Sequence, residues 1–251
     1  MINEISLTLF VFTNRLLGAE RQLDFSTMKK NSEIRQESLA LLKGNWGAGV
    51  GATLLYGITC FVAVFIALLI VTVFKTPTSP ENVQTTSLLT QIASSVVTIF
   101  IIYPIAFGLM TMFLPFVRGE KPLQAGGLFY SLKAPYYGKS IGVYLLTYIF
   151  TLLWTLLLII PGIIKALSYS LAPYILAENP ELTANQAIEL SMKMMKGHKA
   201  KLFLIWLGYC GFALLSIVAL CIPLLWLLPY YFTVFAKFYE EVKSDYNAAA
   251  A

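Results

Sequence analysis

The stretch LLLIIPGIIKALSYSLAPYILAENPE, residues 156–181, decides how this chain folds. It is apolar on both sides of Pro161-Gly162 and carries one charge, Lys165, before its acidic end at Glu178. Proline lacks the backbone donor that continues a helix, and glycine favours turns. The stretch therefore predicts two membrane helices joined by a turn at Pro161-Gly162, with a lysine near that turn.

The composition of the whole chain agrees with this interpretation. Hydrophobic residues make up 58% of the 251 residues, charged residues make up 12%, and the mean hydropathy is +0.73. A soluble domain is about 45–50% apolar and about 25% charged. Several uncharged runs have roughly the 20 residues that cross a bilayer, and none has the polar stripe of a soluble helix. The sequence predicts an all-α, polytopic membrane protein with six transmembrane helices, at 47–74, 88–117, 140–160, 163–178, 202–220 and 224–238.

The basic residues are distributed unequally between the two sides that six spans create. Both termini and every second loop then share one side, which holds 16 of the 18 Lys and Arg residues. Only Lys75 and Lys165 fall on the other side. Because basic loops stay inside, we expect both termini on the cytoplasmic side of the membrane. The net charge of +5 thus reflects topology and contact with anionic lipid head groups, not nucleic-acid binding.

The spans resemble one another in pairs. Ile160-Pro161, Tyr169 and Glu178 recur 62 positions later as Ile222-Pro223, Tyr231 and Glu240. Each unit has an amphipathic interfacial helix, a span, an outer turn and a span ending in Glu; in the helix at 182–196, Thr183 and Gln186 form a capping box. This pattern predicts three helical hairpins repeated in parallel, although short apolar stretches also match by chance. The units are 31–120, 121–180 and 181–241.

The ends of the chain stand outside this pattern. Residues 1–30 form an N-terminal extension, either non-native sequence upstream of Met28 or an interfacial segment, and they lack the features of a signal peptide. Residues 31–243 form the six-helix membrane domain, and 244–251 form a C-terminal tail. The three cysteines have no metal-ligand spacing, so we interpret them as small apolar packing residues.

Three segments resemble a known family: "LLKGNWGAGVGATLLYGI", "IIPGIIKALSYSLAPYILAENPELTANQAIELSMKMMKGHKAKLF" and "LLWLLPYYFTVFAKFYEEV". They are similar to a bacterial family of integral membrane proteins, domain of unknown function nine-seven-five (DUF975). The resemblance covers about 31–243. More distantly, the hairpin at Pro161 is similar to the membrane domain attached to some glycerophosphodiester phosphodiesterases. The resemblance implies the architecture and carries no activity or functional residue.

The sequence offers no candidate catalytic, cofactor-binding or metal-binding residue. Every acidic residue lies in a loop, in a surface helix or at the end of a span, and membrane-embedded carboxylates are missing. His198, the one histidine, has no ligand-type neighbour at helical spacing, so we expect an interfacial role. We therefore predict a protein that is not an enzyme and needs no cofactor. It would organise lipid or serve as the membrane partner of another protein.

A small transporter or permease for an apolar or amphipathic solute is the alternative. Prolines inside the spans, such as Pro104, and tyrosines, such as Tyr174, could border a binding cavity, although both residue types are common in membrane helices. Lys165 and Tyr169 are the candidate contacts for a ligand or lipid, because residues four apart share a helix face. Lys165 would lie about one turn below the outer surface, either snorkelling to the head groups or facing inward toward an anionic ligand.

Overall fold

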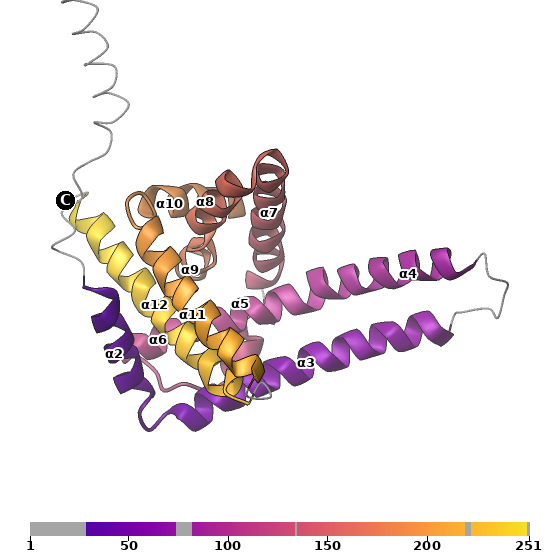
Figure 1. Ribbon diagram of the computed structural model, residues 1–251, viewed down its shortest axis with the longest axis horizontal. Coiled ribbons are helices and arrows are strands. Elements are labelled where there is room, and N and C mark those ends of the chain that lie inside the picture. Colours follow the sequence, from indigo (N-terminus) through magenta and orange to yellow (C-terminus); the bar gives the residue numbers. More distant parts are fainter. Residues whose placement is uncertain (1–28, 74–81, 134, 219–221, 250–251) are drawn as a thin grey trace, which may run out of the picture.

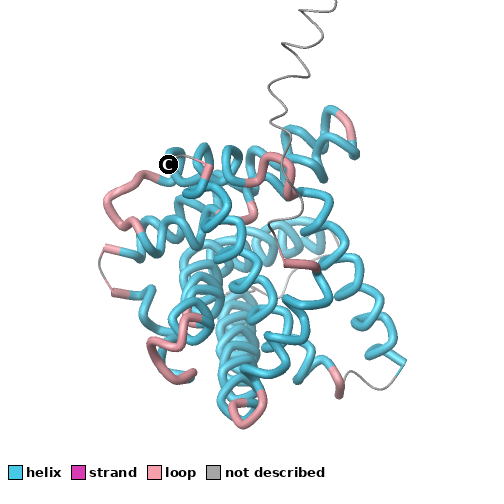
Figure 2. The backbone as a smooth tube through the Cα atoms, turned by 90° about the vertical axis from the view of Figure 1, so that its left-hand side faces the viewer, coloured by secondary structure: helices cyan, strands magenta, loops and turns pink. Residues whose placement is uncertain are grey.

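The computed structural model of the chain describes residues 29–73, 82–133, 135–218 and 222–249. Helices are the only regular secondary structure of the described part, which contains no strand (Figures 1 and 2). The predicted N-terminal extension lies almost wholly outside it, as do Lys75 and Cys221. The elements are α2 (Asn31–Leu42), α3 (Trp46–Val73), α4 (Asn82–Val97), the π-helix η1 (Thr98–Ile102), α5 (Tyr103–Thr111), α6 (Phe113–Val117), the 3-10 helix η2 (Ala125–Leu132), α7 (Tyr136–Leu157), α8 (Ile159–Tyr169), α9 (Ala172–Glu178), α10 (Ala184–Met194), α11 (Lys199–Val218) and α12 (Leu224–Ala248).

Five helical stretches of the described residues are long and apolar enough to cross a membrane. They match the first five predicted runs to within a few residues. The sixth predicted run is the start of α12, which is charged from Lys237 onward. Its uncharged residues 224–236 span about 20 Å of helix, less than the hydrocarbon core of about 30 Å. The five stretches are Trp46–Ile70, Thr90–Val117, Tyr136–Leu157, Ile159–Glu178 and Lys199–Ile217.

The long helices are arranged in contacting pairs: α3 with α4, α7 with α8, and α11 with α12. Figure 1 shows the far ends of these pairs pointing in different directions. The α3–α4 pair projects well beyond the rest of the molecule, whereas α7 runs across the direction of that pair. The long described helices therefore lie in contacting pairs whose far ends diverge.

A break in helical geometry precedes Pro104, in the second predicted span. The five residues of η1, Thr98–Ile102, are π-helical, and α5 follows with Pro104 in its first turn. A proline inside a helix cannot donate to the carbonyl four residues earlier, here that of Phe100. The Tyr137 hydroxyl of α7 donates to the Phe100 carbonyl at 2.9 Å, so this carbonyl has another partner. The span thus continues through Pro104, and α7 stabilises the break.

The predicted turn at Pro161-Gly162 is wrong in its position. The chain reverses at Leu158, whose φ of −160° and ψ of 138° are extended, and Pro161-Gly162 lies in the first turn of α8. Proline is tolerated there because its N–H would have no intrahelical partner. A Cβ on Gly162 would clash with the Thr155 hydroxyl and lie 2.7 Å from the Thr155 Cα. The glycine is therefore needed for the close approach of α7 and α8, not for a turn.

The most deeply buried side chains lie where the short helices meet the C-terminal half of α12. Tyr174 is fully buried, and its ring stacks on Phe235 and on Tyr239, at centroid distances of 5.7 and 5.1 Å. The buried core therefore packs these short helices against α12.

The predicted capping box of α10 is confirmed, because Thr183 accepts from the Gln186 N–H while the Gln186 side chain accepts from the Thr183 N–H.

Candidate functional site

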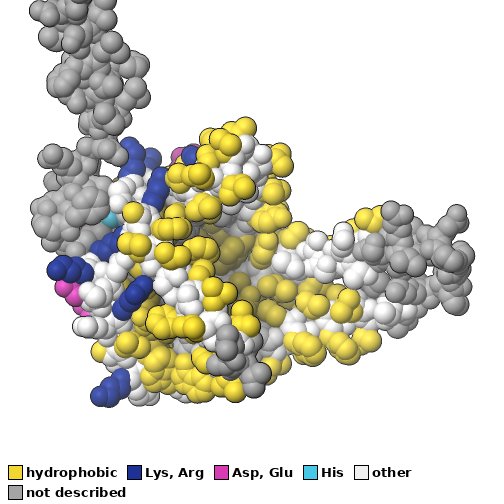
Figure 3. All heavy atoms as spheres, in the orientation of Figure 1, with side chains coloured by type: hydrophobic (Ala, Val, Ile, Leu, Met, Phe, Trp, Pro, Cys, Tyr) yellow, Lys and Arg dark blue, Asp and Glu magenta, His cyan; other side chains and the backbone are white. Residues whose placement is uncertain are grey.

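Charged side chains gather on one side of the molecule (Figure 3). Lys and Arg side chains lie over α2, over the C-terminal half of α12 and over the α10–α11 turn, whereas hydrophobic side chains cover much of the remaining surface. The hairpin tip at α7–α8 is the extreme case, since Leu156 is 84% exposed. This distribution is typical of a membrane protein with one charged interfacial surface.

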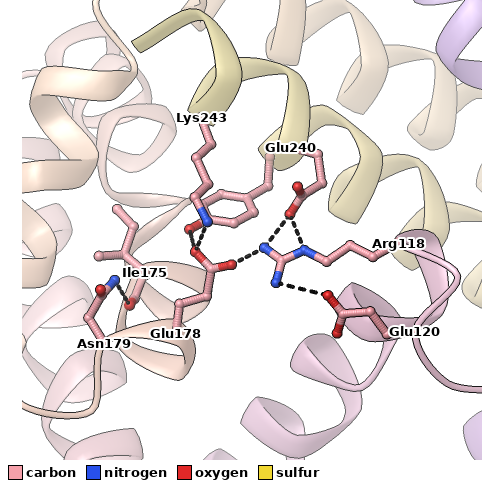
Figure 4. Close-up of polar contacts among 8 residues, drawn as sticks. Arg118, Glu120, Ile175, Glu178, Asn179, Glu240 and Lys243 are labelled. Carbon is pink, nitrogen blue, oxygen red and sulfur yellow. Dashed lines mark hydrogen bonds and ion pairs between the residues drawn. The ribbon is translucent and has the colours of Figure 1, made fainter. Parts of the chain in front are cut away.

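Arg118 binds carboxylates from three separate parts of the chain (Figure 4). Its guanidinium donates to Glu178 and, from Nε at 2.9 Å, to Glu240. Its Nη1 atom lies 3.9 Å from Glu120. These three glutamates are the ones that end the three predicted units. We call the network the Arg118 cluster, and its members are Arg118, Glu120, Glu178, Tyr239, Glu240 and Lys243.

Glu178 is the most enclosed carboxylate of the cluster, with a side chain only 13% exposed. It accepts hydrogen bonds from Arg118, from the Tyr239 hydroxyl and from Lys243 Nζ at 2.7 Å. Burial and the charge of Glu240 raise the pKa of Tyr239, so its hydroxyl remains a neutral donor. Three donors on one carboxylate compensate for its removal from water.

Helix ends bring these groups together. Helix α6 ends at Val117, and Gly119 then adopts the left-handed conformation with a φ of 73°. The Glu120 N–H bonds back to the Pro115 carbonyl at 2.9 Å, which closes a Schellman motif and leaves Arg118 at the helix end. Glu178 is the last residue of α9, and Glu240 lies on the adjacent α12. The cluster therefore joins α6, α9 and α12.

The sequence analysis identified Glu178 and Glu240 as a repeat but named neither Glu120 nor Arg118. A signal for the first unit was present, because Pro115-Phe116-Val117-x-x-Glu120-x-Pro122 matches Pro173-Tyr174-Ile175-x-x-Glu178-x-Pro180, 58 positions later. This match aligns Glu120 with Glu178. Arg118 lies inside the motif at a position where the second copy has Leu176, so no repeat could mark the arginine.

A second network fixes α2 against α12. Lys29 pairs with Glu37 at 2.7 Å and with Glu241 at 3.5 Å, and Lys237 reaches Glu37 at 3.2 Å. The hydrogen bond from Lys29 is the main reason why the pKa of Glu37 is lowered. Ile34 of α2 is 1% exposed in the core beneath these pairs. The helix that precedes the first span therefore lies beside the end of the last helix.

His198 lies in the turn between α10 and α11 and is 4% exposed. Its Nε2 atom lies 3.2 Å from Asp245 Oδ2 on α12, and its buried Nδ1 atom has no hydrogen-bond partner in the described structure. Burial lowers the pKa of His198, while the Asp245 charge acts in the opposite direction. The sequence analysis found no partner for His198 at helical spacing. In the structure its partner is Asp245, which lies on another helix, α12.

Lys165 and Tyr169, the candidate ligand contacts, both lie against α7. The Lys165 ammonium lies 4.8 Å from the centre of the Trp154 ring, and Tyr169 contacts Phe150 at a centroid distance of 6.2 Å. The Tyr169 hydroxyl also lies beside Trp154. Tyr169 is only 4% exposed, whereas Lys165 is half-buried. Of the two, Lys165 is the side chain that a ligand could reach.

The surroundings of Lys165 differ from those expected. Helix α8, which carries Lys165, contacts α10 and α11, and Lys196 and Lys199 lie where α10 turns into α11; we call these three residues the lysine cluster. The predicted fourth span is not straight, because α8 ends at Tyr169 and α9 begins at Ala172. Helix α8 therefore packs against α10 and α11, and Lys165 is not isolated from the other basic residues.

Within the described residues, no group of three or more His, Cys, Asp and Glu side chains could hold a metal ion. Cys60 and Cys210 are free thiols, half-buried among apolar side chains. The charged groups of this surface can therefore bind ions of opposite sign or stabilise one another.

The chain belongs to the family described as Protein of unknown function (DUF975), whose model matches residues 28–168 and 155–246. These two overlapping segments include every helix described above except the last residues of α12. No curated protein and no solved structure matches the chain.

Proposed function

We propose that this DUF975 protein acts without catalysis in the bacterial cytoplasmic membrane, where it organises anionic lipid at the cytoplasmic surface. One observation carries the proposal: the basic residues exceed their acidic partners on the charged side of the molecule. Lys43, Lys133, Lys193 and the lysine cluster have no carboxylate within 4.0 Å in the described structure. Unpaired lysines at a membrane surface attract anionic lipid head groups by about 1 kcal/mol each.

The proposal includes six spans in three hairpins repeated in parallel, with both termini cytoplasmic. Helix α2 precedes the first span and contacts the end of α12, which supports an even number of crossings between them. The ends of α6, α9 and α12 meet at Arg118, which supports a return to the same side after each hairpin. The short apolar part of α12 would cross with Lys237 snorkelling toward the cytoplasm.

Cysteine labelling tests this topology. In a cysteine-free background, a cysteine at Ser32 or at Ser244 should react with an impermeant maleimide only after cell lysis. One at Thr78, in the loop between α3 and α4, should react on intact cells. An odd number of spans would instead place Ser32 and Ser244 on opposite sides, and the six-span proposal would fail.

The buried polar side chains support a non-catalytic scaffold. Thr111 donates to the Phe107 carbonyl at 2.7 Å, and Thr233 donates to the Pro229 carbonyl at 2.8 Å. Ser140 donates in the same way within α7. A side chain that is bonded to its own helix does not need a solute as partner. The interior thus favours packing over transport.

Transport of an apolar or amphipathic solute remains the second candidate because of Tyr174. Its hydroxyl is fully buried and has no hydrogen-bond partner in the described structure. An unpaired buried hydroxyl costs about 1–3 kcal/mol, which a polar ligand atom could recover. Under this alternative, Tyr174→Phe would reduce solute binding while improving thermal stability.

Lipid selectivity of the purified protein distinguishes the two functions. We expect native mass spectrometry of the full chain in mild detergent to show bound phosphatidylglycerol in preference to phosphatidylcholine. Added phosphatidylglycerol should also raise the melting temperature, because a ligand that binds only the folded state stabilises it. Equal binding of the two lipids would refute lipid organisation. A requirement for one co-purifying protein would then favour the role of a membrane partner.

A further inference from the structure

Arg35 of α2 is left out of the ion pairs that its neighbours form. Lys29 and Lys237 both pair with Glu37, whereas no carboxylate lies within 4.0 Å of Arg35 among the described residues. The side chain is half-buried, and its Nη2 atom donates to the Leu204 carbonyl of α11 at 3.4 Å. An arginine stays charged in a protein and has five N–H donors. Most of its capacity to bind an acceptor is therefore unused in the described structure.

Gly208 of α11 provides the space in which the guanidinium lies. A Cβ on Gly208 would clash with Nη2 of Arg35 and lie 3.3 Å from Cζ and 3.6 Å from Nη1. The guanidinium thus lies against the α11 backbone where a side chain is missing. Gly211, three residues further along α11, has nothing within 4 Å of the same position. The close approach is therefore a feature of Gly208 and not of every glycine in this helix.

Two further hydrogen bonds fix α2 along α11. Asn31 Nδ2 donates to the Lys201 carbonyl at 3.1 Å, and Lys201 Nζ donates to the Lys29 carbonyl. Arg35 lies one turn after Asn31 and reaches α11 about one turn after Lys201, at Leu204. The two helices therefore run in the same direction here, and the guanidinium is directed toward the middle of α11.

The guanidinium lies within the apolar stretch of α11, Lys199–Ile217. Leu204 and Gly208 are five and nine residues from its start, or about 8–13 Å at 1.5 Å per residue. In the proposed topology α2 and the start of α11 are both cytoplasmic, so this depth is close to the boundary between head groups and acyl chains. A cation without a counter-ion is costly there. Further along α11, Leu207 and Leu214 are 51% and 66% exposed and present an apolar face.

We propose that Arg35, seated on Gly208, binds the phosphate group of an anionic phospholipid in the cytoplasmic leaflet. The planar guanidinium can donate to two phosphate oxygens at once, a geometry that lysine does not offer. The acyl chains would follow the exposed leucines of α11. This inference rests on the proposed function, because it names one head-group site within a surface that attracts anionic lipid.

Native mass spectrometry of the full chain tests the site with phosphatidylglycerol as the probe. Arg35→Met should weaken binding of the tightest lipid about ten-fold, and Arg35→Lys about three-fold, because lysine keeps the charge and loses the paired donors. Gly208→Ala should weaken it about five-fold without changing any charge, since the added methyl displaces the flexible end of Arg35. Gly211→Ala is the matched control and should change binding less than two-fold.

A purely structural role for Arg35 predicts a different result. If the arginine only holds α2 against α11, phosphatidylglycerol will raise the melting temperature of Arg35→Met and of wild type equally, and the site is refuted. We expect a smaller rise in Arg35→Met and in Gly208→Ala than in wild type. Lys43→Met removes an exposed cation at the other end of α2. It should reduce the number of weakly bound lipids and change binding of the tightest one less than two-fold.

The outcomes separate this inference from the proposed function. If wild type shows no preference for phosphatidylglycerol over phosphatidylcholine, the proposed function fails and this site fails with it. If that preference persists and Arg35→Met matches Lys43→Met, the surface attracts lipid but the inferred site is refuted. If inorganic phosphate displaces the lipid and binds as tightly, the assignment of the site to lipid is overturned. Should Arg35→Met fail to fold, the comparison of Gly208→Ala with Gly211→Ala supplies the same test.

Discussion

Around Arg118, each charged side chain has a partner of opposite sign, whereas the lysine cluster has no carboxylate within 4.0 Å among the described residues. Both regions join elements from different parts of the chain. In the Arg118 cluster, charge attraction itself connects α6, α9 and α12. In the lysine cluster, the hydrogen bonds of Ser191 and close helix packing connect the elements, and charge opposes the arrangement.

This difference separates a structural role from a binding role. Partly buried ions are tolerated when pairing and hydrogen bonds compensate for lost solvation. Glu178 meets that condition with three donors, so its network needs nothing further. The lysine cluster does not meet it within the described residues, and the proposed function supplies an anion from the lipid. We therefore expect mutations in the first region to change stability and mutations in the second to change binding.

Arg118→Met should produce the largest loss of stability. It leaves Glu178 and Glu240 side by side without the cation between them, and Glu178 is only 13% exposed. Exposed ion pairs contribute up to about 1 kcal/mol, and breaking a buried pair costs about 3–5 kcal/mol. For this half-enclosed network we expect about 3 kcal/mol, measured by equilibrium unfolding in detergent. The exposed neighbour variant Lys121→Met is the control and should stay within about 0.5 kcal/mol.

A loss of stability of similar size in Lys165→Met would contradict the difference between the Arg118 cluster and the lysine cluster. We expect that variant to be as stable as wild type or slightly more stable, because it removes a repelling cation. A large loss would show that Lys165 is held in place by an interaction that stabilises the fold. The two clusters would then share a structural role.

Gly162→Ala should have the second largest effect, and it probes the packing beneath the lysine cluster. The added methyl would lie against Thr155 of α7, including its backbone, so α8 must shift. Overpacking of this kind costs about 1–3 kcal/mol. Because α8 carries Lys165, the same variant should also weaken phosphatidylglycerol binding. Gly57→Ala, where a Cβ meets nothing within 4 Å, is the control; equal stability of the two variants would contradict the packing argument.

Ser191→Ala should have the third largest effect, a loss of about 1–2 kcal/mol in the free energy of unfolding. It leaves the Leu171 N–H and the Ser168 carbonyl without their partner in a fully buried position. Thermal unfolding measures the loss, and lipid binding should weaken with it because Ser191 aligns α8 with α10. Ser244→Ala, at an exposed position of α12, is the control. Unchanged lipid binding in a destabilised Ser191 variant would separate the lysine cluster from this hydrogen bond.

The sequence was sufficient for the features that depend on local physics. Composition and run length predicted an all-helical membrane protein, and the Thr183–Gln186 pattern located the start of α10. The same local rules placed the second turn incorrectly at Pro161-Gly162, because proline and glycine also occur where a helix begins or where two helices touch. Turn composition alone does not distinguish these cases.

Features that depend on several distant segments were less accessible. The unit-end glutamates were visible as a repeat, but their meeting at Arg118 requires the three-dimensional approach of α6, α9 and α12. The sequence placed Lys165 about one turn below the outer surface, and that side of the membrane stays a prediction. The break between Tyr169 and Ala172, stabilised by Ser191 from another helix, changed its neighbours. The charge distribution in the sequence predicted a basic surface. Which of its charges are paired depends on tertiary packing, which the sequence alone does not show.

A substitution of His198 should have the smallest effect on stability. His198 lies between the paired Arg118 cluster and the unpaired lysine cluster in character, because only one of its two ring nitrogens has a partner in the described structure. The charged groups that act on it are Asp245 of α12 and Lys201 of α11. Burial is the largest influence and lowers the pKa of His198 below its usual value of 6.5. The unfolded chain therefore binds more protons just below this pH, so the contribution of His198 to stability is complete above 6.5 and is lost as pH falls from 6.5 through the lower pKa of the folded state. His198→Gln keeps a donor for Asp245 but cannot be protonated, so its stability should depend less on pH between about 5.5 and 7.5. Unfolding curves of both proteins across this range measure the difference. If wild type instead loses stability relative to the variant as pH rises through this range, Asp245 outweighs burial and His198 is a paired group like those around Arg118.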